Sequence, residues 1–334
     1  MSVVAVLGAG AWGTALAVHL VEQRARARLW SWQATHAERL RTERENVAFF
    51  PGVLLPEGVV VTHDLQEAVQ GADVVIVVVP TPAVRATLQQ LRRSLSAKPL
   101  LVFASKGIET GTLMLLTEVA EDVLGSDIAE RTVALSGPSF AQEVARGLPT
   151  NLVAAAGDLS AALEVQRLLS GERLRIYTSD DPLGVQVGGA LKNVIAIATG
   201  ASDGLGFGHN TRAALITRGL AEMARLAVAK GGSTLTLAGL AGLGDLVLTA
   251  TAELSRNRTL GFEMARGRSL DEVVTSLGHV AEGVTTAKSA HDLAAQLGVE
   301  LPICSQVYRV LYEGKPVDEA VRELLLRPVG KEWR

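Results

Sequence analysis

Cysteine is nearly absent from this chain, because Cys304 is the only one among 334 residues. This excludes an internal disulfide and any metal site built from several cysteines. The six histidines are scattered and lack the i, i+4 pairing of a zinc-binding helix. We therefore expect no bound metal.

Three further absences concern partners and location. No apolar run reaches the ~18 residues that a membrane span requires, so we expect none. Lys and Arg total 32 against 35 Asp and Glu, which leaves no basic excess to drive nucleic-acid binding. The N-terminus enters a predicted strand at once and lacks the charged leader of a secretion signal. We expect a cytoplasmic protein.

The length of the chain exceeds what one compact core usually contains and predicts two domains. Short apolar strands alternate with helices in the first part and are no longer found after Pro182, where helical periodicity takes over, as in 185–200 and 211–230. This pattern predicts an α/β fold, with a Rossmann-like doubly wound sheet in domain 1–185 and an all-helical C-terminal domain in 186–334. The predicted strands are 3–7, 28–32, 73–79, 100–104, 132–136, 151–156 and 174–178.

A glycine-rich turn, Gly8-Ala9-Gly10-Ala11-Trp12-Gly13, lies between the first strand and the first helix. In a dinucleotide site Gly8 permits the tight turn, Gly10 lets the backbone approach a pyrophosphate, and Gly13 lets the helix pack on the strand. The helix N-terminus adds N–H groups and partial positive charge. An ordinary strand-to-helix turn is the alternative, but the surrounding α/β alternation favours a dinucleotide. We interpret Trp12 as a wall beside the nicotinamide.

The choice between NAD and NADP depends on the end of the second strand, Leu29-Trp30-Ser31-Trp32-Gln33. NAD sites usually place Asp or Glu there, about 20 residues after the loop, to hold the ribose hydroxyls. This segment has no acid, and no arginine directly after it for a 2′-phosphate. Trp32 could stack on the adenine, or Trp30 and Trp32 could simply pack. The sequence leaves NAD and NADP open as a cofactor that is not covalently bound.

Two lysines are candidates for chemistry. Lys106 follows a predicted strand in Ser105-Lys106-Gly107, at the edge where open α/β sheets bind ligands, and is otherwise a solvated surface lysine. Lys192 lies with Asn193 in an otherwise apolar helix, where it either snorkels to the surface or is buried for a purpose. Burial beside another cation would lower its pKa and make it a usable acid/base near neutral pH.

Two later segments have the composition of a binding site. Asp245 and Thr249 are four residues apart and share one face of a predicted helix. Ser255-Arg256-Asn257-Arg258 is a candidate N-cap followed by a guanidinium, which suits a phosphate group. An ordinary capped helix with solvated arginines is the alternative.

Seven motifs together resemble the bacterial NAD(P)-dependent glycerol-3-phosphate dehydrogenases, in that family's order and over nearly the whole chain. They are Gly8–Ala17, Ser105–Gly107, Ser136-Gly137-Pro138-Ser139-Phe140-Ala141, Lys192-Asn193, Gly242–Leu246, Ser255–Asn257 and Glu282-Gly283. The family often has an arginine where this chain has Trp32 and Gln33, which weakens the expectation of a tight grip on a 2′-phosphate. It also often has Thr-Cys where this chain has Thr249-Ala250.

The resemblance implies a role for individual residues, with Lys192 as the general acid/base. Lys106 would depress the pKa of Lys192 and Asp245 would oppose this, so the net direction stays open. The substrate would contact Lys106, Gly137, Ser139, Lys192, Asn193, Asp245, Thr249, Ser255, Arg256 and Asn257. The cofactor would contact Ala11, Trp12, Lys106, Ala141, Arg256, Val280 and Glu282, in addition to Gly8, Gly10 and Gly13 of the loop and Trp32 and Gln33 at the strand end.

The resemblance also implies the reaction, which is reversible hydride transfer between NAD(P)H and dihydroxyacetone phosphate to give sn-glycerol 3-phosphate for glycerophospholipid synthesis. The expected partner is thus a small phosphate substrate. Another two-domain hydroxy-acid dehydrogenase and a non-catalytic dinucleotide sensor are the alternatives. We expect a homodimer, because C2 dimers are the commonest oligomers.

Overall fold

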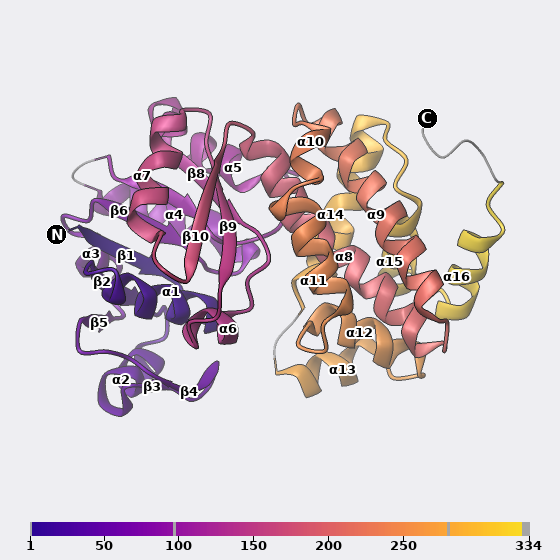
Figure 1. The fold of residues 1–334 in the computed structure, drawn as a ribbon, viewed down its shortest axis with the longest axis horizontal. Helices are drawn as coiled ribbons and strands as arrows, with labels where there is room; N and C mark the ends of the chain where they lie inside the picture. Colours follow the sequence, from indigo (N-terminus) through magenta and orange to yellow (C-terminus); the bar gives the residue numbers. More distant parts are fainter. Residues whose placement is uncertain (1, 96–97, 279–280, 329–334) are drawn as a thin grey trace.

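The computed structural model describes residues 2–95, 98–278 and 281–328. An α/β half and a helical half lie side by side along the long axis (Figure 1). The α/β half contains β1 (Val3–Leu7), α1 (Ala11–Glu22), β2 (Arg26–Trp30), α2 (Ala34–Glu43), β3 (Glu45–Asn46), β4 (Phe50–Leu54), β5 (Val59–Thr62), α3 (Leu65–Val69), β6 (Val74–Val77), α4 (Thr81–Ser94), β7 (Leu100–Phe103), α5 (Leu116–Leu124), η1 (Ser126–Arg131), β8 (Thr132–Ser136), α6 (Ala141–Ala145), β9 (Thr150–Ala155), α7 (Leu159–Leu169) and β10 (Leu174–Ser179).

One sheet organises the α/β half, in the order β10-β9-β8-β7-β6-β1-β2-β5. All neighbouring pairs are parallel except β8 and β9, which are antiparallel. Six neighbouring strands are therefore parallel to one another, namely β8, β7, β6, β1, β2 and β5. Their carboxyl ends lie at one edge of the sheet, where ligands bind in such folds. This arrangement confirms the predicted Rossmann-like fold.

The predicted bounds of the second strand were wrong. The strand begins at Arg26 and ends at Trp30, where its pairing with β1 ends opposite Leu7. The ladder stops because the chain turns away from the sheet at Gly8, whose φ is +128°. Ser31 and Trp32 thus follow the strand rather than belong to it.

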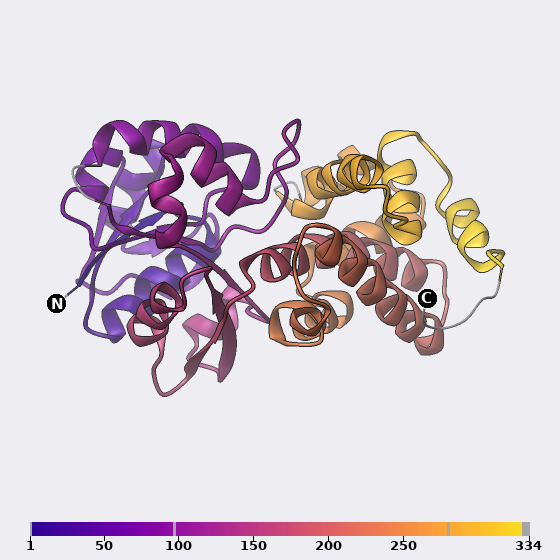
Figure 2. The same ribbon diagram turned by 90° about the horizontal axis from the view of Figure 1, so that it is seen from above.

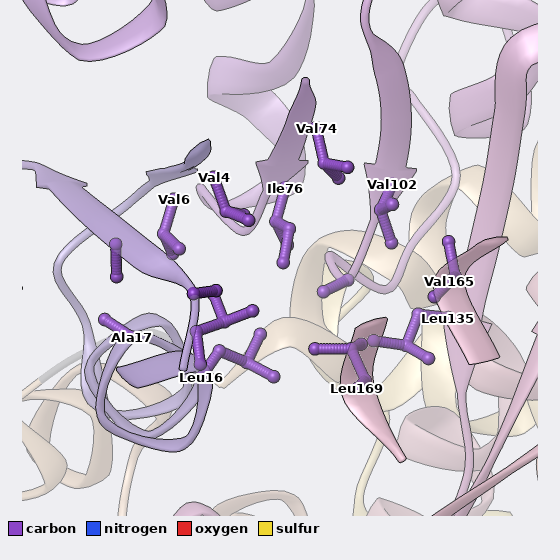
Figure 3. Close-up of a cluster of buried hydrophobic side chains, with 14 of the residues drawn as sticks. Val4, Val6, Leu16, Ala17, Val74, Ile76, Val102, Leu135, Val165 and Leu169 are labelled. Carbon is purple, nitrogen blue, oxygen red and sulfur yellow. The ribbon is translucent and has the colours of Figure 1, made fainter. Parts of the chain in front are cut away.

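The sheet has apolar packing on both faces. Alternate residues of β1 point to opposite sides, so Val4 and Val6 join one core while Ala5 and Leu7 join the other. On the first side Leu16 of α1 packs beside Val6 and Ile76 (Figure 3). Burial on both faces explains the nearly continuous apolar strands of the sequence.

The helical half contains α8 (Pro182–Gly204), α9 (His209–Ala229), α10 (Thr234–Leu237), η2 (Leu240–Gly244), α11 (Asp245–Thr251), α12 (Arg256–Ala265), α13 (Leu270–Leu277), α14 (Glu282–Leu297), α15 (Pro302–Tyr312) and α16 (Val317–Leu325). Beyond β10 the described residues form no strand. Within the described residues, no helix combines the length and apolar character that crossing a membrane demands.

Helix α8 is the buried axis of this half and packs closely on α12. A Cβ on Gly200 would lie 1.9 Å from the Arg258 carbonyl oxygen, and one on Gly261 would lie 1.9 Å from the Ile197 carbonyl oxygen. Only glycine permits this approach of the two backbones.

Residues 105–115, between β7 and α5, connect the two halves, and we call them the strap. Ile108 and Leu115 pair as an isolated bridge and lie in the core of the helical half. The Thr110 hydroxyl lies 3.3 Å from that of Ser289 on α14. Figure 2 shows the strap as a narrow hairpin beside the helical half. Lys106, at its start, is therefore fixed by both halves.

Candidate active site

The glycine loop is built for close backbone approach. A Cβ on Gly8 would lie 2.8 Å from the Val78 carbonyl oxygen, and one on Gly13 would lie 1.9 Å from that of Gly8. A Cβ on Gly10 would meet nothing within 4 Å, so this position faces open space. Gly10 is also the N-cap of α1 and has no side chain to occupy the first N–H groups. The loop therefore fits the pyrophosphate of a dinucleotide.

The two tryptophans at the end of β2 differ in environment. Trp30 is 7% exposed, and its indole N–H donates to the His63 carbonyl oxygen at 3.0 Å, so it packs. Trp32 is 74% exposed and does not pack. Gln33 is the exposed N-cap of α2, and the first carboxylate after β2 is Glu38. Trp32 is thus accessible for stacking, while the choice between NAD and NADP stays open.

Three charged side chains meet where the two halves join. The Asp245 carboxylate, 1% exposed, accepts from the Lys106 ammonium at 2.6 Å and from the Lys192 ammonium at 2.5 Å. Lys192 also donates to the Thr249 hydroxyl at 2.9 Å. Lys192 is therefore buried rather than snorkelling, and Lys106 contributes to the same cluster.

The local fold explains why Asp245 faces α8. The η2 segment is a turn of π-helix, a feature common at functional sites, and it leads directly into Asp245 at the start of α11. A Cβ on Gly188 of α8 would lie 2.6 Å from the Ala241 carbonyl oxygen in this turn. Close contact at these positions brings the first turn of α11 against Lys192.

Burial and neighbouring charges set the protonation of the cluster. Burial lowers the pKa of Lys192 to about 8, Asp245 opposes the shift, and Lys106 adds to it. The sequence left open whether the pKa of Lys192 is raised or lowered, and in the structure it is lowered. Burial alone would raise the pKa of Asp245, but the two ammonium groups outweigh it and hold that pKa below its ordinary value.

Two asparagines link the helices around Lys192. The Asn257 amide donates to the Asn193 side-chain oxygen at 2.9 Å and accepts from the Gly283 backbone N–H at 2.9 Å. Asn193 in turn donates to the Glu282 carboxylate at 3.3 Å. The starts of α12 and α14 are thereby held next to the residue that follows Lys192.

The start of α12 has the predicted cap. Ser255 is the N-cap, and its hydroxyl accepts from the Arg258 backbone N–H at 3.3 Å. Arg256, at the first helical position, is exposed. The structure thus holds Ser255, Arg256 and Asn257 beside the lysine cluster through Asn193.

The segment after β8 approaches the same cluster. The Gly137 carbonyl oxygen accepts from the Lys106 ammonium at 3.3 Å and from the Ser139 hydroxyl at 3.0 Å. Ala141 begins α6. Val280 lies outside the described residues, which also contain no group of three or more His, Cys, Asp or Glu arranged to hold a metal ion.

Sequence reasoning missed two polar residues beside the site. Asp203 binds Arg258 of α12 and Arg212 of α9, each at 2.7 Å. Asp203 lies eleven residues after Lys192, which is about three helical turns. This spacing places both residues on one face of the helix and could have indicated Asp203 from the sequence. Asn46 donates to the Ala9 carbonyl oxygen at 2.9 Å, and nothing in the local sequence indicates this contact.

The chain matches two family models in succession. Residues 3–162 match the N-terminus, and residues 181–322 the C-terminus, of NAD-dependent glycerol-3-phosphate dehydrogenase. The chain belongs to this family. The resemblance drawn from its motifs is confirmed.

Relatives and solved structures agree with this membership. The dehydrogenase is 52% identical to glycerol-3-phosphate dehydrogenase [NAD(P)+] of Geobacter metallireducens, over 97% of each chain. It is 40% identical to the crystal structure of glycerol-3-phosphate dehydrogenase from Coxiella burnetii, with a TM-score of 0.93 over 97% of this chain and 98% of that one. A D-mandelate dehydrogenase, 15% identical with a TM-score of 0.61 over 96% of this chain and 100% of that one, shares the fold alone. The alternative of another hydroxy-acid dehydrogenase is thus not favoured.

Proposed function

We propose that this dehydrogenase reversibly converts dihydroxyacetone phosphate into sn-glycerol 3-phosphate with NAD(H) or NADP(H). The observation that carries the proposal is the buried Lys192 ammonium, which is held by Asp245, while the next residue of α8, Asn193, is bonded to Asn257 at the start of α12. This arrangement combines an acid/base group with a phosphate-binding helix start.

Lys192 moves the proton of the reaction. The bound nicotinamide supplies or accepts the hydride at the substrate C2. During reduction Lys192 protonates the carbonyl oxygen, and during oxidation it removes the hydroxyl proton. Its pKa of about 8 lets both protonation states be populated near neutral pH. Asp245 and Thr249 fix the direction of the Lys192 Nζ atom.

The start of α12 holds the substrate phosphate. The Ser255 hydroxyl accepts from the backbone N–H of Arg258. It does not occupy the backbone N–H groups of Arg256 and Asn257, the first two residues of the helix. These N–H groups and the exposed Arg256 guanidinium suit a phosphate. Fixing the phosphate orients the carbonyl carbon for reaction.

The remaining assignments follow the family resemblance and the geometry around the cluster. We propose domains at 1–185 and 186–334, a homodimer, a cytoplasmic location, and a role in supplying glycerol phosphate for phospholipids. The proposed substrate contacts are Lys106, Gly137, Ser139, Lys192, Asn193, Asp245, Thr249, Ser255, Arg256 and Asn257. The proposed cofactor contacts are Gly8, Gly10, Ala11, Trp12, Gly13, Trp32, Gln33, Lys106, Ala141, Arg256, Val280 and Glu282.

A steady-state assay of dihydroxyacetone phosphate reduction, run in parallel with NADH and NADPH, tests the reaction and measures cofactor preference. If the enzyme shows no turnover with either NADH or NADPH, the proposal is contradicted.

Arg256→Ala tests the phosphate site. We expect kcat/KM for dihydroxyacetone phosphate to fall about 100-fold or more, because a charge-assisted contact to the phosphate is lost. We expect a much smaller change for dihydroxyacetone, which has no phosphate. Equal losses for both substrates would contradict the assignment.

A further inference from the structure

Asn46 is a buried amide that connects the two ends of the dinucleotide site. It lies on β3, outside the main sheet, and is 1% exposed. Its Nδ2 atom donates to the Ala9 carbonyl oxygen at 2.9 Å and to the Thr14 hydroxyl at 2.7 Å. Its Oδ1 atom accepts from the Phe49 backbone N–H at 3.3 Å and lies 3.1 Å from His36 Nε2. Both amide hydrogens and both lone pairs are therefore used.

These partners fix the direction of the hydrogen bonds that Asn46 makes. The Ala9 carbonyl can only accept and the Phe49 N–H can only donate, so the nitrogen and oxygen of Asn46 are unambiguous. His36 Nε2 must then donate to Asn46. His36 Nδ1 lies 3.1 Å from the Ser31 hydroxyl, which also lies within donating distance of the Gln33 carbonyl oxygen, at 3.4 Å.

The result is a chain of polar contacts from Ser31 through His36 and Asn46 to Ala9. Ser31 directly follows β2, where the adenosine ribose binds in this fold, and Ala9 lies inside the glycine loop. Ala9 and Thr14 flank the start of α1, whose first N–H groups would receive the pyrophosphate. The chain thus sets the separation and orientation of the two backbone segments that receive the cofactor.

We propose that Asn46 is a positioning residue for the dinucleotide, holding the glycine loop in its binding conformation and tying it to the end of β2. The inference rests on the proposed cofactor site. Asn46 acts through Ala9 and Thr14 and has no part in the proton transfer. Because Asn46 itself binds Ala9 and Thr14, at the loop that would receive the pyrophosphate common to both cofactors, NADH and NADPH should depend on it to a similar extent.

Asn46→Asp tests the proposal, with dissociation constants for NADH and NADPH measured by nicotinamide fluorescence. The aspartate keeps both acceptor contacts but presents an oxygen to the Ala9 carbonyl, which can only accept. We expect both dissociation constants to rise about tenfold or more, by similar factors, because the buried hydrogen bond to Ala9 is lost and a carboxylate oxygen is set against the carbonyl oxygen. The cofactor KM should rise more than kcat falls, a split that a general loss of stability does not produce.

His19→Gln is the matched control. His19 is a buried polar residue of α1, near the end of that helix opposite to the glycine loop. His19 Nε2 lies 2.7 Å from the Leu169 carbonyl oxygen, away from the loop. This variant should lose stability and keep the wild-type affinity for both dinucleotides. An equal loss of affinity in His19→Gln overturns the proposal.

Thr14→Val provides a second variant should Asn46→Asp not fold, because it removes one partner of the amide at nearly constant volume. We expect a few-fold rise in both dissociation constants. A folded variant that binds both dinucleotides within about twofold of wild type overturns the positioning role. Wild-type protein that binds neither dinucleotide overturns the cofactor site itself, so the two failures are distinct.

Discussion

At the scale of single residues, the central feature is an ammonium group inside an apolar helix. Lys192 lies among buried residues of α8, and its charge is offset by Asp245, itself shared with Lys106. Buried ion pairs add little net stability, and removing one partner costs several kcal/mol because the other charge stays buried. Stability therefore does not explain this cluster, whereas acid/base chemistry does.

Lys192→Met removes the proton carrier at similar volume. We expect kcat to fall at least 100-fold, because general acid/base catalysis contributes about 10²–10⁴-fold. The affinity for NADH, measured by fluorescence, should be retained. Survival of more than about a tenth of kcat would exclude Lys192 from this role.

The pH dependence should differ between the two directions of the reaction. Reduction requires the protonated amine, so its kcat should fall as the pH rises through the Lys192 pKa of about 8. Oxidation requires the neutral amine, so its kcat should rise over the same range. Rate profiles from about pH 6 to pH 10 check both signs, and two parallel profiles would contradict the assignment.

At the scale of elements, contact between α8 and α12 fixes the distance between the acid/base group and the phosphate site. The helices touch at Gly200 and Gly261, and Asp203 of α8 binds Arg258 in the first turn of α12. The backbone carbonyls at this contact cannot move away as a flexible side chain could. The spacing of the site is thus set by glycines outside it.

Gly261→Ala should separate these helices. The new Cβ would lie 1.9 Å from the Ile197 carbonyl oxygen, and we expect a loss of about 1–3 kcal/mol in the free energy of unfolding. The KM for dihydroxyacetone phosphate should rise more than the cofactor KM, because α12 moves relative to Lys192. Gly157→Ala, where a Cβ meets nothing within 4 Å, is the control for urea denaturation and kinetics. Unchanged substrate KM in a destabilised Gly261→Ala would contradict the spacing argument.

At the scale of the whole molecule, one buried carboxyl makes stability depend on pH. Glu222 of α9 accepts from the backbone N–H groups of Ile303 at 2.6 Å and Cys304 at 3.1 Å, at the start of α15. Burial raises the pKa of Glu222 to about 7, against an ordinary value of 4.5, although these N–H groups and Arg225 oppose the shift. Between these two values the folded chain binds more protons than the unfolded chain. The contribution of Glu222 to the free energy of unfolding is therefore full below about pH 4.5 and is lost as the pH rises to about 7.

Glu222→Gln should remove this dependence, because the amide does not titrate. Urea denaturation at pH 5 and pH 7.5 measures the change in the free energy of unfolding between the two pH values. We expect wild type to lose on the order of 1–3 kcal/mol more than the variant over this interval. Equal changes in the two proteins would mean that Glu222 is ionised throughout.

The sequence predicted those parts of the fold and site that depend on local pattern. The glycine loop, the alternation of strands and helices in the first half of the chain, and the Ser255 cap all follow from residues close together in the chain. The antiparallel direction of β9 did not follow from local pattern, because the connection over residues 137–149 is long enough for either direction. Asn46 was also missed, because its contacts to Ala9 and Thr14 depend on the path of the chain around α2.

The strap limits how this protein could be recombined with distant relatives. A hybrid that takes residues 1–180 from this chain and the helical half from another parent would insert Ile108 and Leu115 into a foreign core. The strap and the helices that enclose it should come from the same parent. In the chain, however, strands β8, β9 and β10 of the sheet lie between the strap and those helices. A single junction that leaves the rest of the α/β half intact cannot satisfy this condition, so such a hybrid needs further junctions on both sides of residues 105–115.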